Sequence, residues 1–211
     1  MKLKYTLGLA IISLSSQTIF SVTEPVLTYL KQSVLGSRHN TLAAAIRLAE
    51  ERNVQTILET GTARGGTLAF SGDGGFTILL GYWCFLNNRN LYSVDISEHS
   101  LNGARTMVSQ YEPNVHLIQD DSVNYIRNFD KVIDFLYLDS FDFDTHNPYP
   151  SQKHHLDEII AAYDKLAPHS IVMIDDCGLP HGGKGKLVIE YLLSRGWYIY
   201  MQDYQVIMLR S

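Results

Sequence analysis

The sequence predicts a doubly wound α/β fold, in which a mostly parallel sheet has helices on both faces and ends in an antiparallel C-terminal hairpin. Two observations predict it. Short apolar runs alternate along the chain with segments whose apolar residues recur at helical spacing, and strands that alternate with helices form parallel sheets. Two apolar runs at the C-terminus are separated only by a short turn near Asp203, which is typical of a β-hairpin.

The composition is that of an ordinary globular protein. The chain has 211 residues, of which 45% are hydrophobic and 18% charged, and its formal net charge is −5. These values exclude disordered and collagen-like chains, and the length suits one large domain. An acidic chain has no general attraction to nucleic acid, so we expect no nucleic-acid partner. Cys84 and Cys177 are too few for a disulfide scaffold.

The first 40 residues differ from the rest of the chain. Two lysines precede an uncharged run from Tyr5 to Thr23, and the centre of this run is apolar. A basic start followed by a short apolar stretch is how a signal peptide begins. The alternative is an N-terminal helix that packs on the domain. We therefore divide the chain into an N-terminal segment, residues 1–40, and a domain, residues 41–211.

Helix signals follow in order along the domain. Apolar residues recur at helical spacing over Thr41–Arg52, which predicts a helix capped by Asn40. The same spacing after Ser97 and after Ser151 predicts two further helices, each capped by that serine. A last helix is predicted over Leu187–Arg195, directly before a glycine.

Seven short apolar runs bounded by turn residues are predicted as strands. They cover residues 56–62, 90–97, 115–122, 132–140, 170–177, 197–202 and 205–210. The last two form the hairpin, so the final strand should run antiparallel to the others. The remaining strands should be parallel and covered on both faces.

Acidic residues stand at or near the end of each of the first five predicted strands. They are Glu59, Asp95, Asp120 with Asp121, Asp139, and Asp175 with Asp176. Ligands bind beyond the carboxyl ends of the strands in such sheets, so we expect these side chains to line a ligand site. Clustered carboxylates raise one another's pKa and therefore need hydroxyl, amine or cation partners.

The first strand runs into the motif E-T-G-T-A-R-G-G, from Glu59 to Gly66. Gly61 permits a tight turn and a close approach of the backbone, and Gly65 permits another. A dinucleotide fingerprint would read GxGxxG, but Ala63 takes the middle position, so a nicotinamide cofactor is a weak interpretation. The pattern E-x-G-T-x-x-G after a strand instead resembles motif I of class I S-adenosylmethionine-dependent methyltransferases, particularly small-molecule O-methyltransferases.

The resemblance extends from Leu42 to Ser211 and implies a Rossmann-like domain with a seven-stranded sheet. Asp95 stands where that superfamily places the acid that binds both ribose hydroxyls, and Asp121 stands where its acid meets the adenine amino group. The resemblance thus implies S-adenosylmethionine as the cofactor and a small-molecule acceptor, with a hydroxyl oxygen as the expected target. The implied cofactor-binding residues are Glu59, Gly61, Thr62, Gly65, Asp95, Asp121 and Ser122.

The spacing of the motifs departs from the usual pattern in one place. Asp95 lies 34 residues beyond Gly61, whereas such an acid usually lies about 20 residues on. The excess is a glycine-rich segment from Gly65 to Phe76. It is either a tolerated surface insertion or a loop that folds over the methionine end of the cofactor.

A divalent cation is one way to activate a hydroxyl acceptor, because it lowers the hydroxyl pKa. Cation-dependent O-methyltransferases place an Asp after the fourth strand and an Asp-Asn pair after the fifth. Asp139, Asp175 and Asp176 stand at these positions, with Asp176 in place of the Asn. The resemblance therefore implies Mg²⁺ or Mn²⁺ on these three residues, although the Lys that the family has soon after the first Asp is missing.

A side-chain base is the other way to activate the acceptor. His146, His154, His155 and His181 all lie near the predicted carboxyl edge of the sheet, and histidine suits proton abstraction near neutral pH. The candidate catalytic residues are Asp139, His155 and His146.

Two other interpretations of the site stay open. Gly178–Gly185 nearly matches a phosphate-binding loop, but Gly185 replaces the final Ser or Thr, so a nucleotide triphosphatase is disfavoured. Lys184 and Lys186 in or beside this loop either attract an anionic acceptor or are solvated. The alternatives to a methyltransferase are a non-catalytic cofactor-binding protein of the same fold and a metal-dependent hydroxylase on a similar sheet.

The expected location follows from the cofactor. S-adenosylmethionine is an intracellular methyl source, so we expect a cytoplasmic enzyme, with export or membrane anchoring through residues 2–23 as the alternative. No stretch is long and apolar enough for a confident membrane span, so we expect no stable membrane partner. A homodimer is left open.

Overall fold

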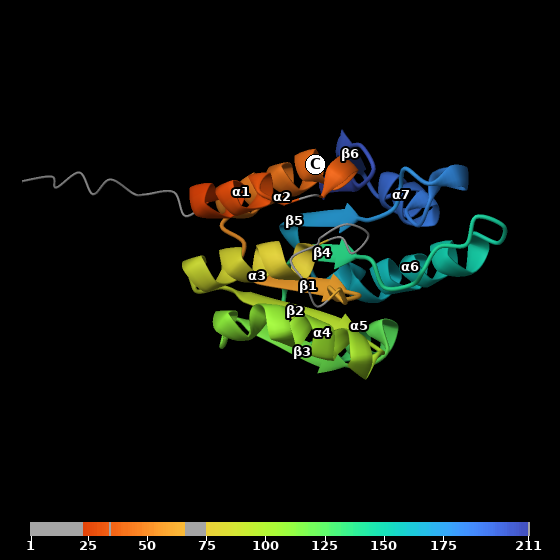
Figure 1. Ribbon diagram of the computed structural model, residues 1–211. Helices are drawn as coiled ribbons and strands as arrows, with labels where there is room; N and C mark the ends of the chain where they lie inside the picture. Colours follow the sequence, from red (N-terminus) through yellow and green to blue (C-terminus); the bar gives the residue numbers. More distant parts are fainter. Residues whose placement is uncertain (1–22, 34, 66–74, 211) are drawn as a thin grey trace, which may run out of the picture.

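The computed structural model describes residues 23–33, 35–65 and 75–210 (Figure 1). Seven strands pair into one sheet: β1 (Thr56–Thr60), β2 (Asn90–Asp95), β3 (Val115–Gln119), β4 (Ile133–Leu138), β5 (Leu166–Ile174), β6 (Trp197–Gln202) and β7 (Val206–Arg210). Their order is β3-β2-β1-β4-β5-β7-β6. Strand β7 runs antiparallel to both of its neighbours, and the pairs from β3 to β5 are parallel. The predicted doubly wound fold with its C-terminal antiparallel hairpin is confirmed.

The α-helices of the described residues cover the two faces of this sheet (Figure 1). They are α1 (Thr23–Lys31), α2 (His39–Glu51), α3 (Phe76–Asn87), α4 (Glu98–Val108), α5 (Ser122–Asn128), α6 (Tyr149–Ala162) and α7 (Lys186–Leu193). Neighbouring residues of one strand face opposite layers because side chains alternate along a strand. Ile57 packs in the cluster that includes α1, α2 and α3, whereas Leu58 packs in the cluster that includes α5, α6 and α7.

Helix α3 was missed by the sequence analysis. Its eight buried residues include every position from Phe76 to Gly81, so burial is not confined to one face. A helix that is apolar on nearly every side has no helical periodicity to detect. Helix α5 was missed as well, because it has only seven residues.

The predicted helix caps have mixed outcomes. The Ser97 side chain accepts a hydrogen bond from the backbone N–H of Ser100, which confirms it as the cap of α4. The other two predictions are wrong: Asn40 lies inside α2, and Ser151 lies inside α6. The Ser151 hydroxyl donates instead to the backbone carbonyl of Phe141, 3.0 Å away. Both helices therefore start earlier than expected.

The described part of the N-terminal segment packs on the domain. Helix α1 buries Val26 and Leu30 completely, and both belong to the core cluster of α2 and α3. A short 3₁₀ turn, Gly36–Arg38, leads directly into α2. Residues 1–22, which carry most of the signal-like pattern, lie outside the described residues. None of the described helices has the length and apolarity needed to cross a membrane.

Candidate functional site

Two adjoining cavities lie at the carboxyl ends of the strands, where the strand order reverses between β1 and β4. The large cavity has a volume of about 270 Å³ and is lined by Gly61, Val94, Asp95, Ile96, Asp121, Ser122, Ser140, Phe141 and His154. The polar cavity, about 40 Å³, is lined by Arg38, Gly61, Thr62, Arg64, Asp95, Asp139, Ser140, Asp175, Asp176 and Lys184. The two cavities share Gly61, Asp95 and Ser140 and therefore form one site.

Gly61 sits at the centre of this site and needs to be a glycine. Its φ is +79°, and a Cβ at this position would lie 2.5 Å from the backbone oxygen of Asp139. The next residue, Thr62, donates its backbone N–H to Asp95, and Ser97 donates to the other oxygen of the same carboxylate, at 3.2 and 2.7 Å. The Asp95 carboxylate is thus held at the border of both cavities.

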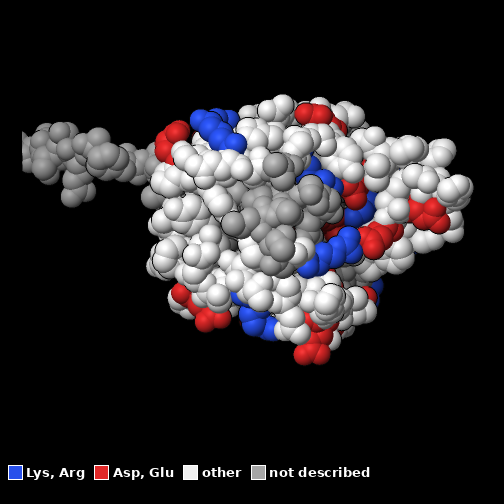
Figure 2. Space-filling view, viewed as in Figure 1, with Lys and Arg blue, Asp and Glu red and all other residues white. Residues whose placement is uncertain are grey.

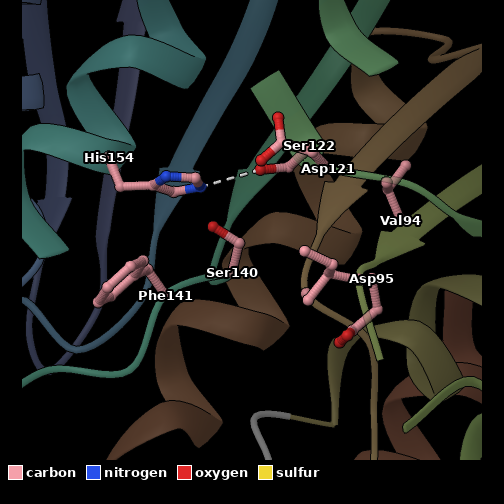
Figure 3. A pocket seen from close by; sticks show the side chains of 9 residues that line it. Val94, Asp95, Asp121, Ser122, Ser140, Phe141 and His154 are labelled. Carbon is pink, nitrogen blue, oxygen red and sulfur yellow. Dashed lines mark hydrogen bonds between the residues drawn. The ribbon is translucent and has the colours of Figure 1, made fainter. Parts of the chain in front are cut away.

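One wall of the large cavity comes from the turn after β3, the start of α5, and α6. Figure 3 shows His154 and Ser122 facing each other, with Ser140 and Phe141 beside them. The Ser122 hydroxyl lies 3.0 Å from Nε2 of His154, and this nitrogen lies 3.4 Å from the buried carboxylate of Glu158. The hydrogen bond to Glu158 raises the pKa of His154 above its usual value.

Three carboxylates converge beside the polar cavity, and we call Asp139, Asp175 and Asp176 the acidic cluster. One oxygen of each lies within 4.8 Å of the others. Their convergence, expected from the neighbouring ends of β4 and β5, is confirmed as geometry. Burial and the adjacent Asp175 raise the pKa of Asp139. Burial would also raise the pKa of Asp176, but Lys184, Tyr204 and Arg38 together outweigh it and lower that pKa.

Two cationic side chains hold the acidic cluster together. Lys184 lies 2.6 Å from Asp139 and 3.1 Å from Asp176. Arg38 donates through Nε to both oxygens of Asp175, at 2.9 and 3.0 Å, and through Nη2 to Asp176 at 2.8 Å. Its guanidinium also stacks on Tyr204, 4.6 Å from the ring centre.

The described side chains do not fit the expected Mg²⁺ or Mn²⁺. Oxygen atoms are the right ligands for these ions, but the oxygens of the acidic cluster already accept hydrogen bonds from Lys184 and Arg38. A divalent ion would have to displace Lys184, whose side chain is only 3% exposed.

Two further residues predicted to bind the cofactor lie beside the cavities rather than in their walls. Glu59 is buried and accepts a hydrogen bond from the Thr77 hydroxyl, which itself accepts from the backbone N–H of Ala63. This contact ties the loop after β1 to helix α3. Gly65 is exposed, and most of the glycine-rich segment after it, residues 66–74, lies outside the described residues.

The four candidate histidines separate in the structure. His154 lines the large cavity, whereas His155 is fully buried in α6 with Nδ1 2.7 Å from the backbone oxygen of Ser151. Burial lowers the pKa of His155 to about 4. The His146 side chain is 96% exposed next to Asp144, and His181 is an exposed residue of a turn. The described cavities therefore contain neither His146 nor His155.

Sequence reasoning missed several site residues. Arg38 comes from the N-terminal segment and carries no local signal for a role 137 residues away. Likewise, no sequence pattern marks Glu158 or Phe141 as a residue of the site. Lys184 did have a signal, because the glycines on both sides of it mark a loop with an unusual backbone. Its partners could not be read from that pattern.

Comparisons with known proteins assign the family. A family model described as a methyltransferase domain matches residues 58–177, from β1 to the residue after the acidic cluster. The chain belongs to this family. A search of curated proteins found no match for this methyltransferase.

Solved structures share its fold at low sequence identity. An SAH-bound methyltransferase of Podospora anserina, PaMTH1, has a TM-score of 0.60 at 13% identity, over 91% of this chain and 88% of that one. The O-methyltransferase NovP has a TM-score of 0.57 at 15% identity, over 90% and 79%. NSun6 from Pyrococcus horikoshii, solved with SFG, has a TM-score of 0.57 at 13% identity. The comparison covers 89% of this chain and 51% of NSun6, so the methyltransferase spans about half of that protein. The fold is that of class I S-adenosylmethionine-dependent methyltransferases.

Proposed function

We propose that this methyltransferase transfers the methyl group of S-adenosylmethionine to a hydroxyl oxygen of a small molecule. The observation that carries the proposal is the pair of adjoining cavities around Gly61. The large cavity has the mixed polar and apolar lining that a nucleoside needs. The polar cavity, which opens from it, places carboxylates beside the point where the reactive group would lie.

The residues of the large cavity fit the adenosine part of the cofactor. Asp95 would accept hydrogen bonds from the ribose hydroxyls, since its carboxylate is fixed by two backbone N–H groups at the cavity border. Asp121 and Ser122 would meet the base at the wall where His154 also lies (Figure 3). Ile96 and Phe141 offer apolar surface to the flat faces of the purine.

The polar cavity supplies the groups that handle the acceptor. Bound S-adenosylmethionine supplies a methyl group on a positively charged sulfur. The acceptor oxygen forms a bond to the methyl carbon as the carbon–sulfur bond breaks, and the electron pair of that bond stays on sulfur. Asp139 takes the hydroxyl proton, because its carboxylate lines the polar cavity and burial raises its pKa toward that of a useful base. Lys184 orients this carboxylate through its contact at 2.6 Å.

The surface charge of the protein suits a small acceptor better than RNA, although solved neighbours include RNA methylases. The chain is acidic overall, with a net charge of −5. Figure 2 shows acidic and basic side chains interspersed over the described surface of this face rather than gathered into a broad basic area. The net charge and the view in Figure 2 both favour a small acceptor over a polyanion. The homodimer and the cytoplasmic location stay predictions.

Calorimetry with S-adenosylmethionine tests the proposal. Asp95→Ala should weaken binding by about 1.5–3 kcal/mol, the range for hydrogen bonds to a charged group. Asp130→Ala is the control, since Asp130 is an exposed aspartate and lies outside both cavities. Absence of binding to the wild-type protein, or an unchanged affinity in a folded Asp95→Ala variant, contradicts the cofactor site. Turnover of an RNA transcript but of no small hydroxyl compound contradicts the acceptor class.

A further inference from the structure

The acidic cluster is already balanced by side chains of this protein. Five of its six carboxylate oxygens accept hydrogen bonds from Lys184 or Arg38. Two cations against three carboxylates leave one formal negative charge. The Lys184 side chain is nearly inaccessible to solvent, at 3% exposed, so its ammonium depends on these carboxylates rather than on water.

The glycine-rich loop Gly178–Gly185 is shaped to deliver Lys184 to this place. Gly183 has φ +55° and ψ −153°, which only glycine adopts readily, and a Cβ there would overlap the backbone oxygen of Asp176. The buried side chain of Gln152 donates to the Gly183 carbonyl at 3.0 Å and fixes the loop from the side of α6. Close packing of this loop on the end of β5 therefore explains the glycines that make it resemble a phosphate-binding sequence.

We infer that Lys184 is the resident cation of the acidic cluster and that it keeps divalent metals out. A divalent ion needs lone pairs of Asp139 and Asp176 that point at the Lys184 ammonium. Both cations cannot share the site, because their repulsion adds to the cost of burying them. The consequence, methyl transfer without added metal, rests on the proposed function.

Mn²⁺ alone is the probe, because its binding to the full chain needs neither cofactor nor acceptor. The wild-type protein should show no saturable binding below about 1 mM by electron paramagnetic resonance or calorimetry. Lys184→Met removes the ammonium and frees the oxygens, so it should bind Mn²⁺ about 100-fold more tightly. Lys184→Arg keeps a cation and should still exclude the metal. Lys186→Met is the matched control, since Lys186 is an exposed lysine two residues along.

The outcomes separate clearly. Micromolar binding of Mn²⁺ to the wild-type protein overturns the inference, and so does a folded Lys184→Met variant that binds no more tightly. If Lys184→Met folds poorly, Lys184→Gln replaces it, and its thermal unfolding is followed with and without Mn²⁺. An unfolding midpoint that Mn²⁺ raises only in the variant supports the inference. An unchanged midpoint in the variant opposes it. Failure of S-adenosylmethionine binding would contradict the proposed function without changing any of these results.

Discussion

Aspartates lie at the ends of the strands on both sides of the ligand site, but their carboxylates find hydrogen-bond partners in different ways. At the ends of β2 and β3, Asp95 and Asp121 accept hydrogen bonds from backbone N–H groups two and three residues further along, and Asp95 accepts one more from the backbone of Thr62. At the ends of β4 and β5, the acidic cluster depends on Lys184 and Arg38, side chains from distant parts of the chain. Local partners form with the strand–helix turn itself, whereas distant partners exist only in the complete fold.

Substitution of arginines should give the largest effect and tests whether the acidic cluster depends on its distant partners. Arg38→Met leaves the buried Asp175 without its partner and should lower the free energy of unfolding by about 3–5 kcal/mol. Arg64→Met breaks a similar pair with Asp142, but those side chains are 54% and 75% exposed, so the loss should be about 0–1 kcal/mol. Urea denaturation of both variants measures the contrast. Equal losses would show that burial does not distinguish the two pairs.

Glycine substitutions test the loop that carries Lys184. Gly183→Ala suffers an unfavourable positive φ, about 1–2 kcal/mol, and a clash with the backbone of Asp176, about 1–3 kcal/mol more. Gly196→Ala shares the positive φ, but a Cβ there meets no atom within 4 Å, so only the first loss applies. The difference in unfolding free energy between the two variants reports the clash together with the extra strain of the Gly183 ψ of −153°. A difference near zero would mean that the loop can move away from β5.

The buried His155 of α6 should make the stability of the fold depend on pH. Burial lowers its pKa in the folded state to about 4, whereas an unfolded histidine titrates near 6.5. The unfolded state therefore binds the proton first, and the fold loses stability as the pH falls from about 6.5 to 4. The loss should be about 2 kcal/mol at pH 5. His155→Leu should remove this component, so the stability difference between variant and wild type, followed by urea denaturation from pH 5 to 7, should change by that amount. A constant difference contradicts the lowered pKa.

Helix caps give the smallest effect and test the local half of the comparison. Ser97→Ala removes the hydrogen bond to the Ser100 N–H at the start of α4 and should cost about 1 kcal/mol of unfolding free energy. Asn40→Ala is the control, because Asn40 is an exposed residue inside α2 and alanine favours a helix, so stability should rise by about 0.5 kcal/mol or stay unchanged. Thermal unfolding of the two variants is sufficient. A loss from Asn40→Ala equal to that from Ser97→Ala would contradict the assignment of the cap.

The sequence by itself determined the parts of this protein that depend on neighbours along the chain. Apolar runs located all seven strands, and a serine before a helical pattern located the Ser97 cap, although the same signal failed at Ser151. The acidic residues at the strand ends also followed, because parallel strands bring their carboxyl ends to one edge. The convergence of Asp139 with Asp175 is a consequence of that topology.

Only the tertiary structure decided what those acids contact and which histidine reaches the site. Helix α3 is buried on most sides and loses the periodicity that marks a surface helix. His154 and His155 are adjacent, yet the rotation of α6 points one into the large cavity and the other into the interior. Arg38 and Lys184 meet the acidic cluster because the N-terminal turn and the loop after β5 both pack at the same strand ends. Contacts between distant segments depend on the packing of the whole chain, and no local pattern of residues encodes that packing.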